Sequence, residues 1–171
     1  MKLRITKYNP YYRDKQGSYL KEEWISICDI GRYYNGALFT AEQYFTVEDA
    51  YIETIKLLLN YQKIDHLVIA RHSDKKRIKS FFTSNQFFSI DKDFIKSLKC
   101  GRKCNIIEIE TIMRLVLRED YWCSFTGKDH TYLDFGYDYY MYYGCDSHIK
   151  LEEINFPNCI YIENNFQSPD L

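Results

Sequence analysis

Two thiols that stand close together in the sequence, Cys100 and Cys104, are the first candidates for chemistry, because cysteine is a common zinc ligand. A structural zinc ion needs four ligands, which normally come as two close pairs. The other four cysteines and the four histidines stand singly, so no second pair completes the set. We therefore expect no metal at Cys100 and Cys104, and no cofactor elsewhere in the chain.

The short motifs that mark common catalytic sites do not occur in the sequence, which has no GxSxG, HExxH, GxGxxG or P-loop pattern. Pairs of carboxylates such as Glu22–Glu23 and Glu152–Glu153 lie in charged segments, where solvated side chains are the common case. We therefore expect a protein that binds rather than catalyses. The alternative is an enzyme whose catalytic residues are dispersed along the chain.

Charge is spread unevenly along the 171 residues, although the net charge of the chain is only −1. A chain this balanced lacks the basic excess that displaces counterions from a polyanion, so we expect no direct binding to nucleic acid. Residues 118–171 hold 3 basic and 10 acidic side chains, a net charge of −7, among many tyrosines. Charge steers an encounter and aromatic anchors supply its desolvated contacts, so this region suits a basic patch on a protein partner. The alternative explanation of the 17 tyrosines is a composition bias unrelated to binding.

The run from residue 131 to residue 143 places the strongest candidates for that contact. If it is one extended strand, alternate side chains share a face, and one face is both acidic and aromatic. The leading candidates on that face are Asp134, Asp138, Tyr140 and Tyr142. Its rim would hold Glu119, Asp120 and Asp129. The alternatives are an ordinary strand whose tyrosine hydroxyls face water, and a turn at Gly136 that reassigns the faces.

The spacing of apolar residues predicts the helices and strands that must position these candidates. Helical spacing of apolar residues predicts helices near 47–60 and 107–118, and Thr40 to Gln43 forms a capping-box pattern. Alternation or short apolar runs predict strands at 2–8, 24–28, 67–70, 121–125, 131–135, 139–143 and 159–163. Weaker patterns predict a basic helix over 73–82 and a short helix over 146–154. We expect a single α+β domain over residues 1–171, with several helices packed on a mainly antiparallel sheet.

The cellular location follows from what the sequence lacks. No stretch approaches the ~20 apolar residues that a membrane span needs, and the charged N-terminus has no apolar core of a signal peptide. We therefore expect no membrane segment and a cytoplasmic protein whose six cysteines are reduced thiols.

Several strings in the chain resemble a group of small bacterial immunity proteins that accompany polymorphic toxins, including those of contact-dependent growth inhibition. They lie toward both ends of the chain, and the segment from about Gln62 to Cys104 has no counterpart. The strings are Tyr8-Asn-Pro-Tyr-Tyr-Arg13, Gly17, Tyr19, Glu23-Trp24, Asp29-Ile-Gly31, Arg114-Leu-Val-Leu-Arg-Glu-Asp-Tyr-Trp-Cys123 and Phe135-Gly-Tyr-Asp-Tyr-Tyr-Met-Tyr143.

The resemblance implies a function by binding, with no catalytic residues to carry over. An immunity protein of this kind binds the C-terminal toxin domain of its cognate system in the cytosol and neutralises it. Many such toxins are nucleases with a basic cleft, which an acidic surface can occlude. The alternatives are another cytosolic protein-binding module and a nucleic-acid mimic.

Overall fold

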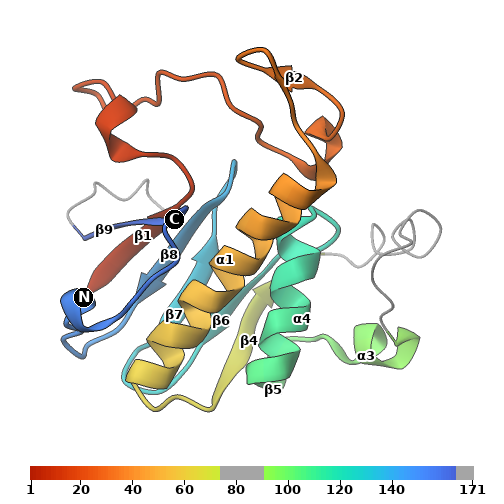
Figure 1. Ribbon diagram of the computed structural model, residues 1–171. Coiled ribbons are helices and arrows are strands. Elements are labelled where there is room, and N and C mark those ends of the chain that lie inside the picture. The colour runs from red at the N-terminus through yellow and green to blue at the C-terminus, as the bar shows by residue number, and fades with distance from the viewer. Residues whose placement is uncertain (74–90, 165–171) are drawn as a thin grey trace.

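The structure, a computed structural model, describes residues 1–73 and 91–164 (Figure 1). The basic helix expected over 73–82 therefore lies outside the described residues, apart from its first residue. None of the described helices is long and apolar enough to cross a membrane.

A seven-stranded sheet forms the centre of the molecule, in the order β5-β4-β6-β7-β8-β1-β9. Every pair of neighbouring strands is antiparallel. The strands are β1 (Lys2–Thr6), β4 (His66–His72), β5 (Lys103–Asn105), β6 (Cys123–Thr126), β7 (Tyr132–Phe135), β8 (Tyr140–Gly144) and β9 (Tyr161–Glu163). With the helices on one face, this sheet confirms the predicted α+β class.

Two long helices, α1 (Ala41–Tyr61) and α4 (Ile106–Leu117), lie side by side across one face of the sheet, and a short helix, α3 (Lys92–Ser97), follows the undescribed segment (Figure 1). The capping box at Thr40 starts α1, and Asn105 caps α4 in the same way. The helix predicted near 47–60 therefore begins earlier, at Ala41, and the Thr46 hydroxyl donates to the Glu42 carbonyl inside it.

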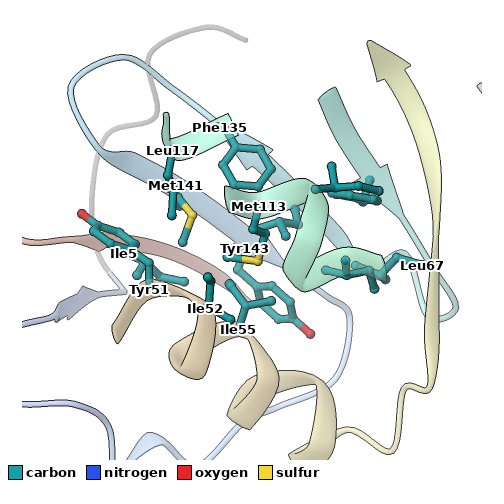
Figure 2. Packing of buried hydrophobic residues seen from close by; sticks show 14 of the residues in the cluster. Ile5, Tyr51, Ile52, Ile55, Leu67, Met113, Leu117, Phe135, Met141 and Tyr143 are labelled. Carbon is teal, nitrogen blue, oxygen red and sulfur yellow. The ribbon is translucent and has the colours of Figure 1, made fainter. Parts of the chain in front are cut away.

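The core fills the space between the two helices and the sheet (Figure 2). Side chains of α1 such as Tyr51 and Ile55 pack against inward-facing side chains of the sheet, among them Ile5, Met141 and Tyr143. Seven of the 17 tyrosines are buried, so much of the tyrosine content serves packing rather than recognition.

A buried ion cluster joins α1 to α4 beside this core. The Glu48 carboxylate is fully buried and accepts from Arg118 at 2.6 and 2.7 Å, and from Arg114 at 2.7 Å. A bidentate contact of this kind fixes direction as well as distance, so the cluster sets how the two helices meet. The C-terminal turn of α4, and the loop that follows it, are held in place through Arg118.

Residues 9–39 leave the sheet after β1 and arch over one of its ends before returning at α1 (Figure 1). We call this segment the arch. It contains two 3₁₀ turns, Pro10–Tyr12 and Ile27–Asp29, and the two-stranded ribbon β2 (Tyr33–Tyr34) and β3 (Ala37–Leu38).

Two elements predicted from the sequence are wrong. Residues 24–28 form no strand, because the Asp29 carboxylate accepts from the backbone of Ile25 and Ser26 and caps a 3₁₀ turn. The helix expected over 146–154 is reduced to the 3₁₀ turn Leu151–Glu153, which has no side-chain cap at its start.

Candidate functional site

The β7–β8 hairpin carries four of the predicted contact residues. Residues 131–143 are not one continuous strand, because the chain turns between Gly136 and Tyr140, whose backbones are joined by a hydrogen bond of 2.8 Å. The assignment of side chains to the two faces of the sheet is nevertheless the same as for a continuous strand. Leu133 pairs with Tyr143 and Asp134 with Tyr142, so a three-residue loop leaves even-numbered residues on one face and odd-numbered residues on the other.

Asp134 and Tyr142 share the face away from the helices, as the alternation predicts, but they are only 7% and 6% exposed. Asp134 Oδ2 accepts from Arg71 Nη2 at 2.9 Å, and Arg71 also reaches Ser124 on β6. Burial raises the pKa of the Asp134 carboxyl, and the charge of Arg71 opposes that shift. Asp134 therefore belongs to a row of hydrogen-bonded polar side chains that crosses β4, β6 and β7. It is not exposed for contact with a partner.

Tyr140 is half-buried on the same face, where it helps to hold the arch. Its hydroxyl accepts from Arg13 Nη1 at 2.9 Å, and its ring lies 5.4 Å from that of Tyr8. Arg13 also pairs with Glu163 at 3.4 Å. Tyr140 thus joins the arch to β8 and β9, and only part of its ring remains open to a partner.

A buried lysine, Lys7, contacts the arch at Glu23 and Trp24. Lys7 Nζ lies 4.1 Å from the ring centres of Tyr8 and Trp24 and 3.2 Å from a carboxylate oxygen of Glu23. Burial lowers the pKa of Lys7 to about 8, against the attraction of Glu23. Trp24 also packs edge-on against Tyr139 at 5.1 Å, so the arch is bound directly to the β7–β8 turn.

The tip of the β7–β8 turn is exposed, and hydrogen bonds to the neighbouring residue hold it in place. Tyr137 is 92% exposed, and Asp138 beside it is exposed with φ at 54°. The next residue, Tyr139, is buried, and its hydroxyl donates to the Leu117 carbonyl at 2.8 Å. The hydroxyl of Tyr51 on α1 donates to the Tyr139 carbonyl. The turn therefore presents Tyr137 and Asp138 from a fixed support.

Glu119 and Asp120 come to the same place from α4. They follow Leu117, the residue that Tyr139 contacts, and Glu119 is exposed with φ at 63°. Partial burial raises the pKa of Asp120 to about 6, and nearby Arg118 limits the shift. We call Glu119, Asp120 and Asp138 the acidic end. None of the three forms an ion pair within residues 1–73 and 91–164.

Asp129 does not join them. It lies in the β6–β7 turn, at the opposite end of the strands, where its carbonyl accepts from the Asp146 backbone at 3.0 Å. Beside it, His130 Nδ1 lies 2.6 Å from an Asp146 carboxylate oxygen, and this contact raises the pKa of His130. These residues surround a wide polar hollow of about 540 Å³. We call this region the polar end.

The arch supplies a feature that sequence reasoning missed. Eight large hydrophobic side chains are exposed among the described residues, and six of them lie on the arch or at the β7–β8 tip. These six are Tyr11, Leu20, Ile25, Tyr33, Leu38 and Tyr137. The Asn35-Gly36 pair between β2 and β3, with both φ angles positive, is the signal that could have found the ribbon.

No group of three or more metal-ligating side chains gathers anywhere in the described part of the chain. Cys100 is exposed and Cys104 is buried. Comparison of the chain with protein-family models, with curated proteins and with solved structures found no match.

Proposed function

We propose that this chain is an immunity-type binding protein that neutralises a bacterial toxin domain in the cytoplasm by occluding its active site. The resemblance of its end segments to such proteins motivates the class. The observation that carries the proposal lies at one end of the sheet. Carboxylates that have no ion pair among residues 1–73 and 91–164 coincide there with most of the large hydrophobic side chains that are exposed in the same ranges. Exposed apolar side chains concentrated in this way are typical of interaction sites.

The acidic end fits a basic partner, of which a nuclease with a phosphate-binding cleft is the expected kind. Glu119 and Asp138 are open to solvent, so they can steer a cationic surface toward the molecule. Tyr137, next to Asp138, has nearly its whole side chain available for burial. Asp134 and Tyr142, by contrast, are already buried in the free protein, so the proposed contact moves from the middle of the sheet to its end.

The proposal is tested by expressing the chain with the C-terminal domain of the toxin whose reading frame lies next to its own gene. We expect the two to co-purify, and the chain to abolish the nuclease activity of the domain at equimolar concentration. Lack of both binding and inhibition would refute the proposal. Binding that leaves the activity intact would favour another protein-binding role.

A further inference from the structure

We infer that a hollow beside the acidic end receives one apolar side chain of the basic partner, an inference that rests on the proposed function. The hollow lies between β3 and the first turns of α1. Its walls are Trp24, Tyr34 and Phe39 of the arch and Val47 of α1, with Ala37 on β3. Its volume is about 190 Å³. Pockets for small molecules measure roughly 300 to 1,000 Å³, so this hollow suits a single side chain.

The walls of the hollow are already in place in the free protein. The ring of Trp24 stacks on that of Phe39, with centres 4.5 Å apart and planes at 16°. Phe39 is 4% exposed, and its backbone is bonded to Gly31 and Arg32 across the arch. Because these groups need no further ordering, a partner side chain meets a low entropic cost on entering. Leu38, at the rim, stays 45% exposed and would be covered by the same partner.

The negative charge of the acidic end indicates that the partner is basic. Trp24 lines the hollow on one side and packs against Tyr139 on the other, so one ring separates the hollow from the turn that carries Asp138. A side chain that enters the hollow therefore brings its neighbours against the acidic end. Arginine or lysine at the neighbouring positions would complement the carboxylates of the acidic end, which have no ion pair in the described part of the chain.

The same charges argue against a second copy of this chain as the occupant. Symmetric dimers bury the same patch on both subunits. Docking of two such ends would bring two copies of Glu119, Asp120 and Asp138 together, and like charges across an interface are strongly unfavourable. A basic toxin domain has no such conflict.

Filling the hollow tests the inference. Ala37 is exposed, lines the hollow and pairs with Tyr34, so Ala37→Trp should occupy the space without disturbing the core. The measurement is the Kd for the toxin domain encoded next to the gene, by titration calorimetry. We expect Ala37→Trp to weaken binding about tenfold or more, as loss of a buried anchor does. Ala37→Ser, which adds almost no volume, should bind like wild type.

Ile107→Trp is the matched control. Ile107 is 75% exposed at the start of α4, away from the arch, and should tolerate the same new side chain with unchanged Kd. If Ala37→Trp lowers the melting temperature, Leu38→Asn replaces it as a rim variant that adds neither bulk nor charge. It should also weaken binding about tenfold, since it removes an apolar contact.

Three outcomes would overturn the inference, and they are distinguishable. If wild type does not bind the toxin domain, the proposed function fails and the inference falls with it. If wild type binds and Ala37→Trp (or Leu38→Asn, where it replaces that variant) binds equally well, the inference alone is wrong. If wild type sediments as a dimer that Ala37→Trp dissociates, the hollow belongs to a second copy of the chain.

Discussion

The two ends of the sheet carry similar exposed carboxylates in different surroundings. At the acidic end, Asp138 stands beside an almost fully exposed tyrosine, in a turn that contacts the arch and its exposed apolar side chains. At the polar end, Asp129 lies beside His130 and Asp146, which already pair with each other around a wide polar hollow. Negative charge alone therefore does not define a protein-binding surface. Exposed apolar side chains that are available for burial distinguish the acidic end from the polar end.

The largest expected effect concerns the support of the acidic end. Glu48→Gln removes the carboxylate that Arg114 and Arg118 share inside the protein. Breaking a buried ion pair from one side costs about 3–5 kcal/mol. We expect a loss of that order in the free energy of unfolding, measured with urea. Glu53→Gln on the same helix, where the carboxylate is half-exposed, should cost less than about 0.5 kcal/mol. Equal losses for the two variants would contradict the role of the cluster.

Removal of the exposed tyrosine at the tip should weaken binding rather than folding. We expect Tyr137→Ala to raise the Kd for the toxin domain by a factor that corresponds to about 2 kcal/mol, the loss typical of a strong aromatic anchor. Its melting temperature should match that of wild type, because the side chain is 92% exposed. Tyr61→Ala, at the far end of α1, is the control and should leave the Kd unchanged.

The partly buried carboxyl of Asp120 should make the acidic end sensitive to pH. Its pKa is raised to about 6 in the folded protein, against an ordinary value near 3.8, so the unfolded chain releases this proton first. Stability is therefore lost as the pH rises from about 4 to about 6. We expect Asp120→Asn to be more stable than wild type at pH 7, by about 1 kcal/mol after allowance for solvent screening. The difference should vanish near pH 4 in urea titrations, and a variant less stable at pH 7 would contradict this.

The polar end should show a smaller, purely local effect. Its contact with Asp146 raises the pKa of His130 above the ordinary value of 6.5. Asp146→Asn should lower that pKa, which a titration of the imidazole by NMR measures directly. The Kd for the toxin domain should not change. A loss of affinity would show that the polar end also takes part in binding.

Local signals in the sequence predict the helices and part of the site. The capping box at Thr40 marks the start of α1, and helical spacing of apolar residues locates α4. Alternation places Asp134 with Tyr140 and Tyr142 on one face. The burial of Asp134 could not be foreseen, because Arg71, which pairs with it, comes from a strand 63 residues away. The position of the arch depends in the same way on contact of Trp24 with Tyr139. Such contacts leave no trace in the neighbouring sequence.

Asp138→Lys and Asp129→Lys compare the two ends of the sheet as partner-binding surfaces. Both aspartates are exposed in hairpin turns and have nearly equal φ angles, 54° and 52°, so the substitutions are matched in charge, exposure and backbone. The Kd for the toxin domain is measured at low and at high salt. We predict that Asp138→Lys weakens binding about tenfold or more at low salt and less at high salt, while Asp129→Lys binds like wild type. Equal losses for the two variants, or a loss confined to Asp129→Lys, would contradict the account.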